Sequence, residues 1–463
     1  MNKYIILLLA LCFGLNNAHA QQSSWKTDNE GWVLRKEPGQ NKYKRFFAVG
    51  IWNIPGYHKQ AMDTKEGDFR SIGQKYLNKT DLYNIVFTIP GKNKDAHNRI
   101  EIGCSMPFFY ALKEYQEKLP VHKEDNPYRQ YVDRRYMQKH CNDQSFIDAL
   151  DKTINDLIQK HGDVEHIWAP IDEIVQGGSG ASWTWYPEIG QKIKERIKQE
   201  EPNTLIYTDL LGVARGNYYL FEKRYMKTHK SMPDNLPPFD VLGPDAKIME
   251  SHPTLGFFQS YNGKPVYENG TANYANFDLP TLKDVFYNNL KICAKDYKKC
   301  GDVFGLNAFM DCNAYPVLAG IAVDGIKAGV GENTPVWLYF DGNGYAQPSN
   351  EGTEAFVKNL KCQMYTSIIH GATGIMFWND RSKPVDVFNS LETVVKEITN
   401  NIPIFILKTE KKQIDNDLHY MIKTDGSKRY LIASNTNKKV SVPLHVGNYD
   451  KILKPLEVII VDL

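Results

Sequence analysis

Two adjacent carboxylates follow an apolar run in the stretch HIWAPIDEIVQGG, residues 166–178. Asp172 and Glu173 come directly after His-Ile-Trp-Ala-Pro-Ile, and glycines follow them. A short apolar run of this kind is typical of a buried strand. A carboxyl group at the end of a buried strand is partly removed from water, and a neighbouring carboxylate disfavours its ionisation further. Glu173 therefore has the surroundings that a general acid needs in order to stay protonated near neutral pH.

Polar and aromatic residues end the other predicted strands in the same way. These residues are Trp52, Asn53, Asp209, Asn307, Asp341, Trp378 and Asn379. Asp and Asn are also common at strand ends because they favour turns, so a turn explains any single one of them equally well. The joint pattern is more informative, because the carboxyl ends of the strands of a parallel barrel meet at one mouth.

Strands alternate with helices along most of the chain. Helical patterns separate apolar runs that predict strands at 46–52, 83–89, 166–171, 204–209, 302–308, 335–340 and 374–378. We expect an eighth strand within 95–140. This alternation predicts βαβ units around a parallel sheet. Eight units predict an α/β fold, a (β/α)8 TIM barrel over residues 45–405. An open doubly wound sheet is the alternative, but no G-x-G-x-x-G motif follows a strand to support it.

Four segments depart from the barrel pattern. Residues 1–20 combine a lysine, a short apolar stretch and Ala-His-Ala, which predicts a cleaved signal peptide and an exported protein, periplasmic or secreted. Residues 21–44 form a polar leader. Residues 213–280, rich in Pro, Tyr, Asn and Gly, predict a long excursion over one face of the barrel. Residues 406–463 contain short strands without helices, which predicts a small antiparallel β domain that leans on the barrel.

The composition argues against several classes of partner. The 463 residues include 56 Lys and Arg against 54 Asp and Glu, a net charge of +2, which argues against a nucleic-acid or membrane-surface partner. Outside residues 1–20, no apolar segment approaches the length that is needed to span a membrane. The sequence has no C-x-x-C pair, no Cys/His cluster with zinc spacing, no phosphate-binding loop and no G-x-S-x-G motif. We expect neither a metal nor a cofactor, and the sequence predicts neither disulfide pairing nor oligomeric state.

Carboxylates, Trp and Asn without a cofactor motif are typical of glycoside hydrolysis. Two carboxylates flank the scissile bond in such sites, one of them a protonated acid. Trp presents a flat apolar face to a sugar ring, and Asn and Asp bind its hydroxyl groups. Trp183, Trp185 and Tyr345 lie in loops just past the acids. Packing within the loops explains each of them, and a role as a further sugar platform is the alternative. The expected partner is therefore a carbohydrate substrate.

The sequence resembles a large clan of TIM-barrel glycoside hydrolases. These enzymes carry the acid/base Glu at the end of the fourth strand, a nucleophile Glu at the end of the seventh and a Trp after the eighth. The resemblance covers roughly residues 45–400 and rests on RFFAVGIWN, IWAPIDE, TPVWLYFDG and HGATGIMFWN. It implies that Glu173 is the acid/base and that Trp378 forms the floor of the subsite for the cleaved sugar. It also implies that Asp172 replaces the usual Asn that contacts the sugar 2-hydroxyl.

The seventh strand departs from the clan because it ends in Asp341 instead of Glu. Asp is one methylene shorter than Glu. Asp341 is then a nucleophile if the surrounding backbone brings its carboxylate closer to the anomeric carbon. Alternatively, Asp341 is a base that acts through water, which requires a larger distance between the two carboxylates. A third alternative is substrate assistance, because the adjacent Asp-Glu pair is similar to that of hexosaminidases in which an N-acetyl group attacks. A glycan-binding barrel without catalysis is the alternative outside enzymes. The sequence thus predicts an exported glycoside hydrolase with Glu173 and Asp341 as its two carboxylates.

Overall fold

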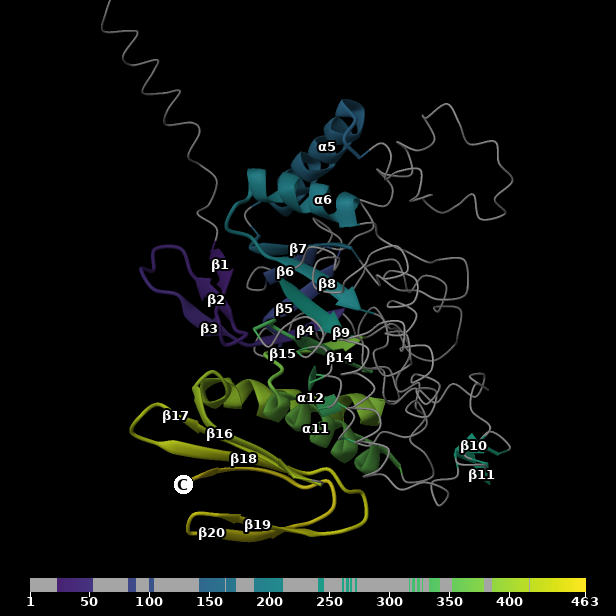
Figure 1. Cartoon of the computed structure of the whole chain (residues 1–463), viewed down its shortest axis with the longest axis vertical. Helices are drawn as coiled ribbons and strands as arrows, with labels where there is room; N and C mark the ends of the chain where they lie inside the picture. Colours follow the sequence, from purple (N-terminus) through teal and green to yellow (C-terminus); the bar gives the residue numbers. More distant parts are fainter. Residues whose placement is uncertain are drawn as a thin grey trace, which may run out of the picture.

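In its described residues, the computed structural model contains an eight-stranded sheet, four long helices and five smaller sheets (Figure 1). It describes residues 23–52, 82–88, 100–103, 141–162, 164–171, 187–210, 240–244, 333–341, 352–378, 385–415 and 417–463, with short pieces at 260–261, 264–265, 267–268, 271–272, 316, 319–320, 323–324 and 327. In Figure 1 two helices lie above the barrel strands and two below them, and the C-terminal strands lie beneath the lower pair.

The central sheet has eight parallel strands that follow one another around the sheet in chain order. The strands are β4 (Ala48–Trp52), β5 (Ile85–Thr88), β6 (Ile100–Gly103), β7 (His166–Ile171), β8 (Ile206–Leu210), β9 (Val241–Pro244), β14 (Trp337–Asp341) and β15 (Gly374–Trp378). The last strand, β15, pairs with the first, β4. The two edge strands, β9 and β14, lie next to each other, although no ladder joins their described residues. This circular order confirms the prediction of an α/β barrel.

The sixth place in the barrel is not filled as the sequence predicted. We expected residues 302–308 there, but β9 pairs with β8 in that place, and residues 302–308 lie outside the described part. β9 also falls within the predicted excursion 213–280. Its sequence is Val-Leu-Gly-Pro, and Gly and Pro are breaker signals that hide a strand of four residues. The strand expected within 95–140 is found as β6.

Four helices flank the barrel: α5 (Gln144–His161), α6 (Pro187–Glu200), α11 (Gly352–His370) and α12 (Val385–Phe405). α5 buries Phe146, Leu150, Ile154 and Leu157, which recur at the three- and four-residue spacing of one helix face. It ends at Gly162, whose positive φ of 58° closes the last turn with an N–H bond to the carbonyl of Ile158. α11 is buried from Cys362 to His370 because it lies between the barrel and the C-terminal sheet.

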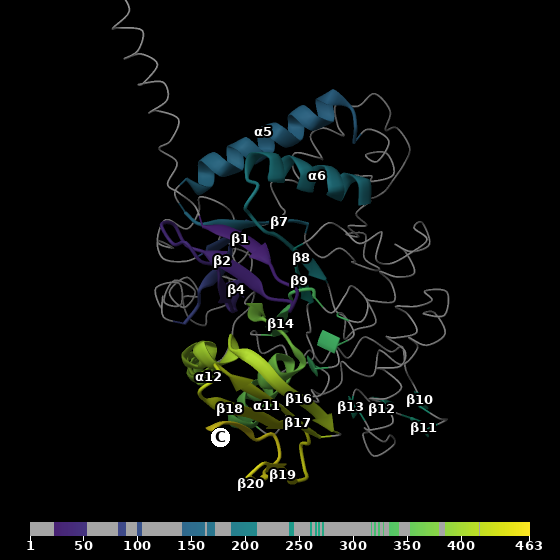
Figure 2. The ribbon, with the colours of Figure 1, turned by 60° about the vertical axis from the view of Figure 1, so that its left-hand side comes forward.

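The polar leader contains a small antiparallel sheet that the sequence analysis did not predict. Its strands are β1 (Ser24–Thr27), β2 (Val33–Lys36) and β3 (Lys44–Phe46). Trp25 donates its backbone N–H to Asn203 just before β8, and Arg35 binds Glu165 just before β7. The sheet therefore lies at the amino ends of the barrel strands. Figure 2, in which this side comes forward, shows β1 and β2 in front of β4.

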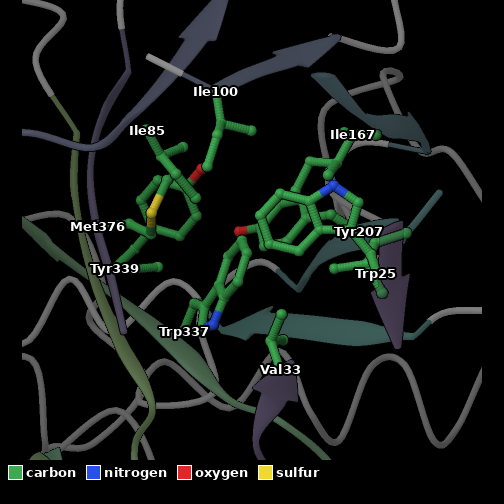
Figure 3. Close-up of a cluster of buried hydrophobic side chains, with 12 residues drawn as sticks. Trp25, Val33, Ile85, Ile100, Ile167, Tyr207, Trp337, Tyr339 and Met376 are labelled. Carbon is green, nitrogen blue, oxygen red and sulfur yellow. The ribbon is translucent and has the colours of Figure 1, made fainter. Parts of the chain in front are cut away.

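Large side chains fill the barrel interior near this end (Figure 3). Trp25 and Val33 of the N-terminal sheet join a buried cluster with Ala48, Ile85, Ile100, Ile167, Ala169, Leu205, Tyr207, Trp337, Tyr339 and Met376. The rings of Tyr207 and Trp337 stack with centroids 5.8 Å apart. The N-terminal sheet thus closes the amino end of the barrel.

Two glycines make room for this core. A Cβ atom on Gly374 would lie 2.5 Å from Cδ1 of Trp337 and 2.7 Å from Cβ of Ala48. A Cβ atom on Gly50 would lie 2.3 Å from Sδ of Met376. All three distances are shorter than any van der Waals contact. β15 therefore needs glycine at position 374, where the ring of Trp337 enters the barrel, whereas at Gly50 the flexible end of Met376 would have to move.

The C-terminal strands form an antiparallel domain on the far side of α11. β16 (Lys408–Asp415), β17 (Leu418–Thr424), β18 (Arg429–Asn435) and β21 (Val458–Asp462) make one sheet, and β19 (Val442–Val446) pairs with β20 (Tyr449–Leu453). A small core holds the strands together, including Tyr420, Ile422, Leu431, Ala433, Leu444 and Leu453. The sheet docks on α11, where Cys362 Sγ donates to the carbonyl of Asn435 at 3.3 Å. Among the described helices, none is long and apolar enough to cross a membrane.

Candidate functional site

The residues predicted at the carboxyl ends of the strands lie at one edge of the barrel. Trp52 is the last residue of β4, Asp341 ends β14 and Trp378 ends β15, three strands that are neighbours in the sheet. Asp341 is the direct ladder partner of Trp378. Asp209 lies in β8, next to β9, and its ladder partner is Gly243. In Figure 1 the arrowheads of β8 and β9 point away from the N-terminal sheet, so this edge is the one that the N-terminal sheet leaves open.

The barrel core reaches to within a few residues of these strand ends. Its residues in the same strands are Ala48 in β4, Tyr207 in β8, Trp337 and Tyr339 in β14, and Met376 in β15. Trp52, Asp209, Asp341 and Trp378 follow these core residues by two or four positions. The barrel therefore brings two acidic residues and two tryptophans to strand ends at one edge of the sheet.

The register between β7 and β8 shifts near the carboxyl end of β7. β7 pairs with β8 at Trp168 and Ile206 and again at Ile171 and Thr208, so β7 advances three residues where β8 advances two. This segment of β7 contains Pro170, which has no N–H to donate to a ladder. The backbone pairing of β7 is therefore irregular over its last residues.

Two tyrosines that the sequence analysis did not select lie directly below the carboxylate positions. Tyr207 precedes Asp209 by two residues, and Tyr339 precedes Asp341 by two residues, and both tyrosines belong to the barrel core. Their ring centroids lie 6.4 Å apart, and both rings are buried. The repeated pattern Tyr-x-Asp in the two strands is the signal that could have identified them. These rings form the upper layer of the described core beneath the mouth.

A buried ionic cluster lies on the helix-facing side of β7, at its amino end. His166 Nδ1 lies 3.0 Å from the carbonyl of Val164, and its Nε2 lies 3.0 Å from Oε2 of Glu201, which also accepts from Trp168 Nε1 at 2.6 Å. Both ring nitrogens of His166 thus face oxygen atoms, and its Nε2 pairs with the carboxylate of Glu201. Burial raises the pKa of Glu201, but the bonds from His166 and Trp168 outweigh it and lower the pKa overall.

His161 belongs to the same cluster and is neutral. Its ring stacks on His166 with centroids 3.8 Å apart. Burial first, and then the charge of His166, lowers the pKa of His161 to about 2. The cluster fixes α5 and the end of α6 to β7 at the amino end of the strand, away from the open mouth. Its role is structural, and no part of the candidate chemistry requires it.

The remaining predicted residues lie outside the described part of the structure. They are Asn53, Asp172, Glu173, Trp183, Trp185, Asn307, Tyr345 and Asn379. Their roles stay predictions. Within the described residues, no group of three or more His, Cys, Asp or Glu side chains could hold a metal ion.

No protein-family model and no curated protein sequence matches this chain. Among solved structures it is similar to an Anoxybacillus alpha-amylase, at 11% identity over 90% of this chain and 97% of that chain with a TM-score of 0.46. A Nostoc punctiforme debranching enzyme shares 11% identity over 90% of this chain and 96% of its own, with a TM-score of 0.40. A maltogenic amylase from S. marinus shares 10% identity over 93% and 72%, with a TM-score of 0.41. Likeness at these identities and TM-scores is too distant to show a shared activity, and the barrel assignment rests on the strand order of this chain.

Proposed function

We propose that this protein is a glycoside hydrolase whose active site opens at the carboxyl end of the barrel. The observation that supports the proposal most directly is the set of residues at the strand ends on that side. Asp209 in β8 and Asp341 at the end of β14 lie at the same edge of the sheet as Trp52 and Trp378, and the opposite end of the barrel is closed by Trp25 and Val33. Acids beside aromatic platforms suit a sugar ring, which has both hydroxyl groups and apolar faces.

We assign the chemistry to residues at the ends of the fourth and seventh strands. Glu173 is the proposed general acid/base, and Asp341 is the proposed nucleophile or base on the other side of the glycosidic bond. Asp172 orients the substrate, or its N-acetyl group where the substrate has one. The proposed sugar contacts are Trp52, Asn53, Asp209, Asn307, Trp378, Asn379, Trp183, Trp185 and Tyr345. The sequence of residues 1–20 supports export of the enzyme to the periplasm or the medium.

Asp172 and Glu173 are adjacent in the sequence directly after β7. Both residues therefore need substitution, and the experiment separates their roles.

The test is sugar release from a broad panel of oligo- and polysaccharides by the mature protein, Glu173→Gln and Asp172→Asn. The matched control is Glu195→Gln, which changes an exposed glutamate of α6. We expect the wild type and the control to cleave the same glycan, and Glu173→Gln to lose activity by about 100-fold or more because general acid catalysis is removed. Full loss in Asp172→Asn with an active Glu173→Gln would transfer the acid role to Asp172.

Asp341→Asn separates the possible mechanisms on whichever glycan is cleaved. Retention of anomeric configuration in the first product, followed by proton NMR, together with loss of activity in Asp341→Asn supports Asp341 as nucleophile. Inversion supports Asp341 as a base acting through water. Retention with an active Asp341→Asn protein supports substrate assistance. Binding of a glycan without cleavage by wild type would replace the enzyme with a glycan-binding barrel.

A further inference from the structure

A chain of three titratable side chains crosses the junction between the barrel and the C-terminal sheet. Oδ2 of Asp324 lies 2.7 Å from Nδ1 of His370, and Nε2 of His370 lies 2.9 Å from Nδ1 of His419. His370 is the last residue of α11, and His419 is the second residue of β17. Both imidazoles are buried, with exposed fractions of 2% and 0%. The chain therefore connects barrel segments to the C-terminal domain in a region that excludes water.

The geometry of the chain limits the number of protons that it can hold. The carboxylate of Asp324 is an acceptor, so Nδ1 of His370 carries a hydrogen. A single hydrogen then fits between Nε2 of His370 and Nδ1 of His419, because a hydrogen bond joins one donor to one acceptor. Either His419 donates to a neutral His370, or a cationic His370 donates to a neutral His419. If both imidazoles are cationic, two N–H groups face each other and the bond is lost.

The surroundings of the two rings oppose a second positive charge. Both imidazoles are buried, and burial disfavours the charged form of a group. Two lysines also lie close to the end of α11. Lys412 of β16 donates to the backbone carbonyl of His370 at 3.5 Å, and a Cβ atom on Gly371 would lie 3.3 Å from Cε of Lys327. Asp324 faces the pair with its carboxylate.

The ring of His370 also has little space in which to turn away from His419. A Cβ atom on Gly320 would lie 2.5 Å from Cδ2 and from Nε2 of His370, so the backbone of Gly320 packs directly against the ring. If both rings are protonated, the repulsion between the two facing N–H groups is relieved only when β17 moves away from α11. The neighbouring contact between Thr366 of α11 and Ser434 of β18 is 3.1 Å long. Ser434 is the ladder partner of His419, so the same movement would strain this contact.

We propose that His370 and His419 form an acid-labile latch, closed at neutral pH, that releases the C-terminal β domain from α11 when both imidazoles are protonated. The expected range of release lies below about pH 6, where histidine gains its proton in proteins. The inference goes beyond the proposed function and does not depend on it, because neither histidine lies at the carboxyl end of the barrel.

The test is hydrogen–deuterium exchange of β17 and β18 in the full chain, corrected for intrinsic rates, at about pH 7 and about pH 5. His419→Gln retains an acceptor for His370 but cannot take up a proton. His445→Gln is the matched control, because His445 is an exposed histidine of the same domain that binds Asp450. We expect protection of β17 in wild type and in His445→Gln to fall about tenfold at the lower pH, and protection in His419→Gln to stay constant. Equal pH responses in wild type and His419→Gln would overturn the latch.

A second measurement keeps the proposal testable if His419→Gln does not fold. Carbon-13 NMR of the histidine Cε1 positions follows both imidazoles in the wild-type protein. We expect the second protonation of the pair to coincide with loss of the native signals of β17. Two fully protonated imidazoles in a protein whose β17 signals remain native would contradict the latch.

Discussion

Lys423 shows how a single buried charge makes the stability of this protein depend on pH. Its side chain is 3% exposed, and its Nζ lies 5.3 Å from the ring centroid of Trp32 and donates to the carbonyl of Leu407 at 3.2 Å. Burial, followed by the charge of Arg45, lowers the pKa of Lys423 from 10.5 to about 7, while Glu30 acts in the opposite direction. The unfolded chain therefore holds this proton more tightly than the folded protein does. The free energy of unfolding should rise with pH between about 7 and about 10.5.

Substitution of Lys423 by Met is expected to stabilise the protein near pH 7 and to flatten this rise. Met keeps an apolar stem beside Trp32 and removes the charge, and the carbonyl of Leu407 keeps its bond from Arg45. Urea unfolding of wild type and Lys423→Met near pH 7 and about pH 9.5 measures the effect. Lys408→Met, on an exposed position of β16, is the control. An unchanged slope in Lys423→Met would show that Lys423 stays charged in the folded protein across this range.

At the scale of elements, the pairing of β15 with β14 and β4 depends on the absence of a side chain at one position. Gly374→Ala is expected to destabilise the protein by about 1–3 kcal/mol, because its Cβ would overlap Trp337 and Ala48. Chemical denaturation gives the loss. The double-mutant cycle with Trp337→Leu provides the control, since the smaller side chain makes room for the new methyl group. If the double mutant loses as much free energy of unfolding as the two single mutants together, Trp337 is not the side chain that excludes a methyl group at position 374.

Elements with strong local signals were predictable from the sequence. The apolar runs that became β7, β14 and β15 carry β-branched and aromatic residues, and the positions of Trp52, Asp209, Asp341 and Trp378 followed from the ends of such runs. β9 was not predictable in this way because Gly and Pro occupy half of its four residues. The sheet of residues 24–46 was read as a polar leader because its buried residues, such as Trp25 and Val33, are few and widely spaced.

Contacts between segments that are far apart in the sequence could not be predicted. Glu201 pairs with His166 across 35 residues, and no local sequence pattern indicates a buried pair of this kind. Tyr207 and Tyr339 belong together only because the barrel places β8 and β14 around one interior. The bulge in β7 had a local signal in Pro170, but its effect on the register depends on the pairing with β8.

At the scale of the molecule, the N-terminal sheet ties three parts of the chain together. Trp25 fills the amino end of the barrel, while Trp32 lies between Arg45 of the same sheet and Lys423 of the C-terminal sheet, each cation 5.3 Å from a ring centroid. Arg45 also binds the carbonyls of Ile406 and Leu407 at the end of α12. The segment read as a leader is therefore an integral part of the fold.

Removal of the Trp25 side chain tests this role. Trp25→Ala is expected to destabilise the protein by about 3–5 kcal/mol, because it leaves a cavity at the base of the barrel. Trp25→Phe is the matched control, since it keeps an aromatic ring and removes an indole N–H that has no hydrogen-bond partner among the described residues. Thermal unfolding of both variants measures the difference. A small loss of stability in Trp25→Ala would mean that the barrel does not depend on the Trp25 side chain at its amino end.

The ladder between β15 and β4 has a consequence for the order in which the protein can be made. These strands are more than 300 residues apart, as Gly374 pairs with Ala48, so the first barrel strand has no partner on one side until nearly the whole polypeptide has left the ribosome. Until then the nascent chain exposes an unpaired, apolar strand edge, which can pair with other chains and lead to aggregation. Biogenesis of this protein should therefore be slow, largely post-translational, and dependent on factors that hold the growing chain unfolded.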